Sequence, residues 1–146
     1  MNDRTRDLNE LIVSQEAMIE SYARLIAKVK DTELKKTLKS LQESHFNQMM
    51  LISDRVVDIG EEPQYKIGLK GVMDDMRQKR SREKEMTDID YAEIALDAER
   101  IIAEKHASFK LGEADPTSVE LLHMTINEDE ENIKALEEYI QRSKPQ

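Results

Sequence analysis

Four polar residues interrupt apolar stripes that otherwise continue at helical spacing, and they are the residues of this sequence best suited to do chemistry. The stretch 119–140 shows this most clearly, because Asp129 fills the one gap in an a/d series formed by the apolar residues Leu122, Ile126, Ile133, Leu136 and Ile140. Gln15, His45 and Glu99 interrupt three other stripes in the same way. Buried groups of these types must either satisfy one another or enclose a cation, and their oxygen and nitrogen atoms suit Fe, Mn or Zn.

The elements that must position these residues are four long helices. We expect them at residues 3–30, 32–59, 87–111 and from 116 to just before the C-terminal RSKPQ. Asp31, Thr87 and Asp115 stand at N-cap positions, and Gly60 stands where the second helix should stop. These signals divide the chain into helices without any strand pattern.

The long connection between the second and third helices decides the topology. It covers about 28 residues (60–87), and we expect a short helix over 67–80, whose end overlaps a basic run at 77–84. A helix of about 28 residues is roughly 42 Å long, and a connection of this length spans that distance even when part of it is helical. The second and third helices should therefore run parallel. The fold class is an all-α four-helix bundle with one long crossover that contains a short extra helix.

The spacing of the four polar residues predicts that they meet. Gln15 and His45 lie 16 and 14 residues from the first tight turn, at residue 31, and Glu99 and Asp129 lie 14 and 16 residues from the second, at residue 113. Equal offsets from a turn place residues at equal heights in an antiparallel pair, so we expect one polar layer in the middle of the bundle. Two amides one turn away could join it, Gln42 and Asn132.

Composition narrows the function classes. The 146 residues form one expected domain, 1–146, with a net charge of −9 and no cysteine. An acidic chain without a basic stripe is a poor partner for nucleic acid or anionic membranes, and no apolar run reaches the length of a membrane span. We expect a cytoplasmic protein. There is no Gly-rich phosphate loop and no Ser/His/Asp arrangement with supporting signals, so hydrolase and kinase functions have no support.

The helix pattern, the long second connection and the mid-helix polar residues resemble the ferritin-like superfamily, which includes bacterioferritin and rubrerythrin. The stretch 60–106 is most similar to a group of small, poorly characterised ferritin-like bacterial proteins, through GEEP after the second helix, then GLKGVMDDM, then an acidic residue on the third helix. The resemblance covers nearly the whole chain. It implies a di-iron site with Glu on helices 1 and 3 and Glu-x-x-His on helices 2 and 4.

The first two helices depart from that motif. Helix 1 has Gln15 where the motif has Glu, although Glu16 is adjacent. Helix 2 has Gln42-x-x-His45, which keeps the imidazole and loses the acid.

Helices 3 and 4 each keep a carboxylate at a ligand position of the motif. Glu99 matches the motif, and the last helix has Asp129-x-x-Asn132, with a shortened acid and an amide in place of the imidazole. Two hypotheses follow. The chain is a non-enzymatic structural or interaction protein with a degenerate centre and no cofactor, or it is a metal-binding oxidoreductase or iron-handling protein with a single Fe, Mn or Zn ion.

Two further features bear on metal binding and assembly. His106 and His123 could approach each other near the second turn, with Glu120 beside them, although two imidazoles alone hold a metal ion weakly. The resemblance implies pairing along helices 1 and 2, and a homodimer is the simplest closed assembly. A divalent metal ion is the other expected partner.

Overall fold

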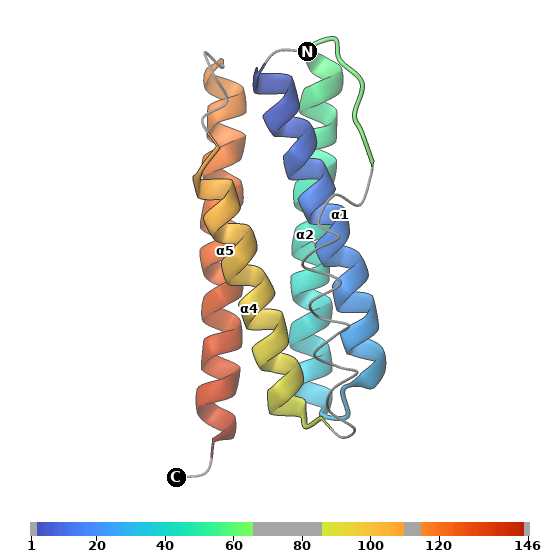
Figure 1. The fold of residues 1–146 in the computed structure, drawn as a ribbon, viewed down its shortest axis with the longest axis vertical. Helices are drawn as coiled ribbons and strands as arrows, with labels where there is room; N and C mark the ends of the chain where they lie inside the picture. Colours follow the sequence, from blue (N-terminus) through green and yellow to red (C-terminus); the bar gives the residue numbers. More distant parts are fainter. Residues whose placement is uncertain (1–2, 66–85, 110–114, 145–146) are drawn as a thin grey trace.

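The computed structural model describes residues 3–65, 86–109 and 115–144, and these residues form four helices and no strand. The helices are α1 (Asp3–Lys28), α2 (Thr32–Asp58), α4 (Asp88–Ala107) and α5 (Pro116–Ser143) (Figure 1). This confirms the expected all-α four-helix bundle, with helix ends near the expected residues except that α4 ends at Ala107. The expected short helix at 67–80 and the basic run at 77–84 lie outside the described residues.

The caps form as the sequence indicates. The Asp31 carboxylate accepts from the Leu34 backbone N–H, and Thr87 and Asp90 form a reciprocal capping box at the start of α4. Gly60 follows α2 with φ of 83°, a left-handed conformation that favours glycine. Each of these contacts satisfies backbone groups that a helix end leaves without partners.

Contacts at both ends fix the topology. At one end, the Asp88 carboxylate accepts from the backbone N–H groups of Lys30 and Asp31, at 2.9 Å each, and the Tyr139 hydroxyl donates to Asp31 at 2.8 Å. The start of α4 therefore lies beside the α1–α2 turn, and α4 runs parallel to α2 (Figure 1). The crossover that the long connection predicts is confirmed.

At the other end, Asp115 joins three helices. Its carboxylate caps α5 through the Ser118 backbone N–H and accepts from Arg55 at 2.7 Å and Arg4 at 2.8 Å. The Ser118 N–H and the Arg55 guanidinium together lower the pKa of Asp115 to about 2.

Helix α5 begins beyond the last turn of α4, so the second hairpin is not symmetric about its turn (Figure 1). Helices α1 and α2 pack together along their length, as do α4 and α5, and α2 also contacts α5 and α1 contacts α4. This staggering shifts the heights of residues on α5 relative to those on α4.

The buried core divides into two apolar clusters. One is built around Tyr22, Leu38, Ala95 and Leu136, and the other around Leu8, Leu11, Ile12, Ile52, Val56 and Leu122. The buried polar residues Ser14, Gln15, His45 and Gln48 on α1 and α2 lie between the parts of those helices that form the two clusters. None of the described helices combines the length and apolar character that crossing a bilayer requires.

Candidate functional site: two buried histidine centres

The first centre is built around His45 and joins α1, α2 and α4. The His45 ring donates from Nδ1 to the Gln15 amide oxygen and from Nε2 to Glu99 Oε1. Gln15 and Glu99 are fully buried and His45 is 1% exposed. Three of the four polar residues singled out in the sequence therefore do meet. We refer to Gln15, Tyr22, His45 and Glu99 as the His45 centre.

Tyr22 completes this centre. Its hydroxyl donates to Glu99 Oε1 at 2.9 Å, and its ring stacks on the His45 imidazole with centroids 5.8 Å apart. Burial raises the pKa of Tyr22 well above its usual value, and the negative charges of Glu99 and Asp129 raise it further. The phenol is therefore a hydrogen-bond donor that holds the carboxylate in place.

The second centre is built around His106 and joins α1, α4 and α5. His106 Nδ1 donates to Asp129 Oδ2 at 2.6 Å, and Nε2 lies 2.6 Å from the Ser14 hydroxyl. That hydroxyl donates to the Leu11 carbonyl at 2.8 Å, so it accepts from the imidazole. Ser14 and His106 are fully buried and Asp129 is 1% exposed. We refer to Ser14, His106 and Asp129 as the His106 centre.

The two imidazoles share one hydrogen-bonding pattern. In each, both ring nitrogens lie within hydrogen-bonding distance of an oxygen atom, so neither nitrogen is free. Each imidazole is paired with one carboxylate, Glu99 or Asp129. Neutral pairs with hydrogen-bonded partners are the form in which charges are tolerated in a core.

The His45 centre retains polar atoms that its hydrogen bonds do not use. Glu99 Oε2 and the Gln15 amide nitrogen are buried and have no hydrogen-bond partner in the described structure. The amide nitrogen of Asn132, one turn along α5 from Asp129 and 4% exposed, is in the same condition. Orphaned buried groups of this kind point to a bound water, ion or ligand, or to a functional strain.

Asp129 pairs with a different residue of α4 from the one its spacing predicts. It binds His106, which is two turns along α4 from Glu99, and it makes no hydrogen bond to the His45 centre. Counting from a symmetric turn fails here because α5 starts beyond the end of α4 (Figure 1). The same staggering separates His106 from its expected neighbour, since His123 is exposed and His106 pairs with Asp129 instead.

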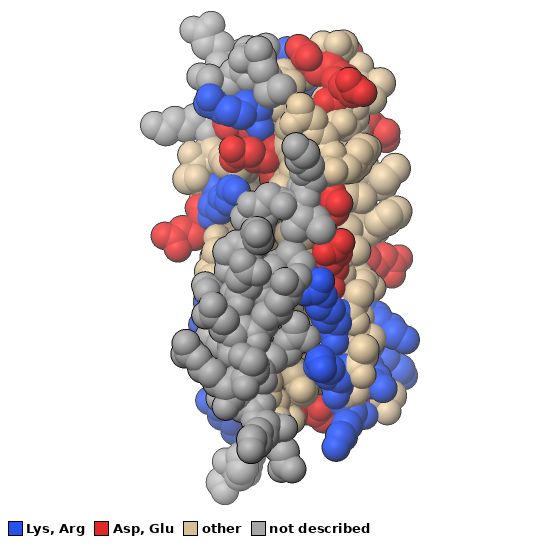
Figure 2. Space-filling model, turned by 45° about the vertical axis from the view of Figure 1, so that its right-hand side comes forward, with Lys and Arg blue, Asp and Glu red and all other residues tan. Residues whose placement is uncertain are grey.

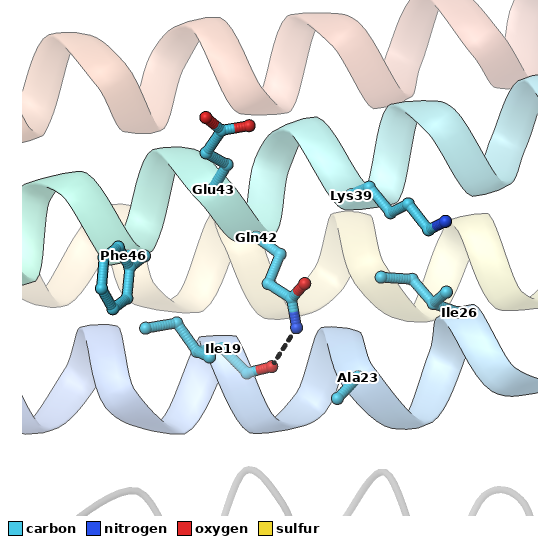
Figure 3. A pocket seen from close by; sticks show the side chains of 7 residues that line it. All are labelled: Ile19, Ala23, Ile26, Lys39, Gln42, Glu43 and Phe46. Carbon is cyan, nitrogen blue, oxygen red and sulfur yellow. Dashed lines mark hydrogen bonds between the residues drawn. The ribbon is translucent and has the colours of Figure 1, made fainter.

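Gln42 and Glu16 lie closer to the surface. The Gln42 amide donates to the Ile19 carbonyl at 3.0 Å and lines a surface groove between α1 and α2 (Figure 3). Glu16 is half-buried, and its pKa is raised by burial and by the neighbouring Glu20. Neither side chain makes a hydrogen bond that the structure shows to the His45 centre.

Several members of the polar layer are not predicted by the sequence pattern. Tyr22 lies in an apolar stripe, and the spacing predicts neither Ser14 nor the buried contact in which the Thr125 hydroxyl donates to the Gln48 amide oxygen at 3.0 Å. A signal existed for these residues, because Ser14, Gln48 and Thr125 are small or neutral polar residues close to the inward faces of their helices. Neutral polar residues are common on helix faces, so that signal is weak by itself.

The donor set fits a two-metal centre poorly. Among residues 3–65, 86–109 and 115–144, no three His, Asp, Glu or Cys side chains are grouped so that they could hold a metal ion. A metal-binding imidazole needs a free ring nitrogen, and both nitrogens of His45 and of His106 are engaged in hydrogen bonds. A metal ion at either centre would have to open one of these hydrogen bonds.

Ser14, His106 and Asp129 stand in the order of a hydrolytic triad, but their chemistry differs. The Ser14 hydroxyl donates its hydrogen to Leu11 O and so receives one from His106, whereas a nucleophilic serine must give its proton to the imidazole. All three side chains are sealed from solvent. This arrangement is suited to holding three helices together and unsuited to attacking a substrate.

Comparison with known proteins identifies the family of this chain. No curated protein and no solved structure matches the chain. A family model described as a domain of unknown function matches residues 3–109, which include α1, α2 and α4 and therefore both histidines. Since the match takes in well over half of the 146 residues, the chain belongs to this family, Domain of unknown function (DUF2383).

Proposed function

We propose that this chain is a non-enzymatic bundle of the ferritin-like type, in which a degenerate di-iron-type centre has become a hydrogen-bonded layer, and that it acts as a structural or interaction module. The crossover topology supports the kinship with ferritin-like proteins. The observation that carries the functional part is the commitment of both His45 ring nitrogens to oxygen acceptors.

The polar layer can stabilise the arrangement of the helices without a metal ion. Each histidine centre ties three helices through directional contacts, and such contacts fix helix register in a way that apolar packing alone does not. The His45 centre joins α1, α2 and α4, and the His106 centre joins α1, α4 and α5. Between them the two centres reach all four described helices.

Elemental analysis combined with thermal unfolding tests the proposal. The purified full chain, dialysed after loading with Fe²⁺, Mn²⁺ or Zn²⁺, should carry less than one equivalent of metal, and EDTA should leave its Tm unchanged. A ligand that binds the folded state stabilises it by mass action. Two equivalents of iron per chain that survive dialysis, or a large fall in Tm with EDTA, would overturn the proposal.

A second candidate function rests on the orphaned atoms of the His45 centre. Glu99 Oε2 is a buried oxygen without a partner, and a single Fe, Mn or Zn ion that replaced a His45 hydrogen bond would use it together with the Gln15 amide oxygen. This alternative is a metal-binding oxidoreductase or iron-handling protein. It expects one equivalent of metal that is lost in Glu99→Gln and retained in Glu137→Gln, a variant of an exposed carboxylate on α5.

A further inference from the structure

A groove of about 710 Å³ runs between α1 and α2 at the surface of the bundle (Figure 3). Its volume falls in the range of small-molecule sites, roughly 300–1,000 Å³. Its few lining residues are far short of the roughly 20–30 residues a side that a standard protein interface uses. The groove therefore suits a small molecule better than a partner protein. Its lining is formed by Ile19, Ala23 and Ile26 from α1 and by Lys39, Gln42, Glu43 and Phe46 from α2.

The two ends of the groove differ in chemistry. Phe46, which is 48% exposed, stands at one end, and Lys39 stands near the other (Figure 3). Lys35 lies one turn beyond Lys39 on the same side of α2. Neither lysine forms an ion pair with another residue of the described ranges. Between the ends, the Gln42 amide is held in place because it donates to the Ile19 carbonyl at 3.0 Å. The groove is thus apolar at one end and cationic at the other.

The acidic side chains near the groove strengthen this difference between its ends. Glu43 belongs to the lining, but its carboxylate points away from the other lining side chains (Figure 3). Glu16 lies at the Phe46 end, because its neighbour Gln15 is hydrogen-bonded to His45, the neighbour of Phe46. An anionic group in the groove is therefore attracted to the lysine end and repelled from the Phe46 end.

The surface around the lysine end is basic as well. Residues 24–40, which contain the α1–α2 turn, include six basic and two acidic residues. Both acids are engaged, since Asp31 caps α2 and accepts from Tyr139, and Glu33 is paired with Arg142. Figure 2, which turns the right-hand side of Figure 1 forward, shows Lys and Arg gathered in the lower half of its right-hand side and Asp and Glu mostly in the upper half. In a chain of net charge −9, this end of the bundle is where an anion is attracted.

We propose that the groove binds a free single-chain amphiphile with a carboxylate head, such as a fatty acid, with its head beside Lys35 and Lys39 and its chain directed toward Phe46. Burial of the chain supplies the attraction, and the lysines orient the head. The levels of Lys35 and Phe46 are separated by roughly 16 Å of helix, which an acyl chain of medium length spans. A free molecule is favoured over a lipid in a bilayer, because an acidic protein is repelled by an anionic membrane surface.

Isothermal titration calorimetry of the full chain with dodecanoate, below its micelle concentration, tests the site and the place of the acyl chain. The wild type should bind a single equivalent with a Kd of ~0.1 mM or tighter, and acetate, which has the head without the chain, should show no binding. Ala23→Phe fills the groove and should raise the Kd for dodecanoate at least ~10-fold. The matched control is Ala107→Phe, because Ala107 is exposed at the end of α4 and should leave the Kd unchanged. Far-UV circular dichroism checks that both variants keep their helices.

A charge reversal tests the place of the head. Lys39→Glu should raise the Kd for dodecanoate by ~10-fold at low salt and by less at high salt, since it sets like charges together. The same variant should change the Kd for dodecanol, which has the chain without the charge, by less than about twofold. Lys134→Glu, at an exposed lysine of α5, should leave both Kd values unchanged.

Four results would each overturn the inference. They are a wild type that does not bind dodecanoate, equal affinity for dodecyltrimethylammonium, which has the opposite charge on the same chain, and equal effects of Ala23→Phe and Ala107→Phe. The fourth is sedimentation of the chain with phosphatidylglycerol vesicles without binding of free dodecanoate, which would assign the basic end to a membrane surface. None of these results bears on the metal content that tests the proposed function.

Discussion

The two buried histidine centres have the same chemistry and differ in how completely it is satisfied. In the His106 centre, both ring nitrogens, the Ser14 hydroxyl and Asp129 Oδ2 are paired, and none of its side-chain atoms is among the orphaned buried ones. In the His45 centre, Glu99 Oε2 and the Gln15 amide nitrogen have no partner. We call the His106 centre closed, because its buried polar atoms have partners, and the His45 centre open, because two of its buried polar atoms have none.

This difference indicates which centre only stabilises the bundle and which could also bind a ligand. A closed network gains nothing from a ligand and loses hydrogen bonds if one enters. An open network is where a water or a cation finds free donors and acceptors. Mutation should therefore lower the unfolding free energy most at the closed His106 centre. Added metal ions should act most strongly at the open His45 centre.

The largest expected effect comes from breaking the closed centre. Asp129→Ala leaves the buried His106 without its carboxylate, and removing one partner of a buried pair costs about 3–5 kcal/mol of unfolding free energy. Urea unfolding of the full chain measures this loss. The double variant His106→Leu/Asp129→Leu should recover much of it, because apolar side chains of similar volume need no partner. A loss below ~1 kcal/mol for Asp129→Ala would contradict the closed-centre description.

Two neighbouring residues compare the centres directly, since Ser14 belongs to the closed one and Gln15 to the open one. Ser14→Ala removes the acceptor of His106 Nε2 and should cost about 1–3 kcal/mol, the penalty for a buried donor without a partner. Gln15→Met removes the acceptor of His45 Nδ1 but also removes an orphaned amide nitrogen, so its cost should be smaller, within ~1 kcal/mol. Urea unfolding of the two variants shows which of them loses more unfolding free energy. The reverse order would mean that the Gln15 amide is satisfied in solution.

The sequence was sufficient for the helices and for the crossover. Cap residues such as Asp31, Thr87 and Asp115 act locally, and Gly60 stops α2 through its own backbone conformation, so their effects can be derived without tertiary information. The burial of Gln15, His45 and Glu99 also followed from spacing, because a gap in an apolar stripe faces the core whatever the neighbouring helices do.

Pairing within the layer did not follow from spacing. Counting from residue 113 predicts that Asp129 lies beside Glu99, but the stagger between α4 and α5 depends on residues near the turn and on packing between the two helices (Figure 1). That stagger brings Asp129 to His106. Ser14 was missed because a small hydroxyl on an inward face gives little signal until its partner is known.

Tyr22 gives the next prediction, because its hydroxyl donates to the carboxylate of the open centre. Tyr22→Phe keeps the ring that stacks on His45 and should cost about 1.5–3 kcal/mol near pH 7, the value of one hydrogen bond to a charged group. Such a loss is intermediate between those of Asp129→Ala and Gln15→Met.

The same residue makes stability depend on pH in the alkaline range. Its pKa is raised in the folded chain by burial and by Glu99, so the stability that it contributes is fully present below the unfolded value, near 10, and is lost as pH rises above it. The wild type should therefore lose up to ~1.4 kcal/mol more per pH unit above pH 10 than Tyr22→Phe does. Tyr139→Phe, at a less buried tyrosine with a raised pKa, serves as the comparison. Parallel pH curves for the wild type and Tyr22→Phe would contradict this assignment.

The smallest expected effect comes from an ion pair that joins the same two helices as His106 and Asp129 but lies in water. Arg100 donates to Glu137 at 2.9 Å, and the two side chains are 52% and 51% exposed. Solvent screens this pair and two long side chains must be ordered to form it, so Glu137→Ala should change the unfolding free energy by less than ~0.5 kcal/mol. Urea unfolding at low and high salt measures it. A loss comparable to that of Asp129→Ala would mean that contact between α4 and α5, and not burial of the histidine–carboxylate pair, determines the cost of breaking a link between these helices.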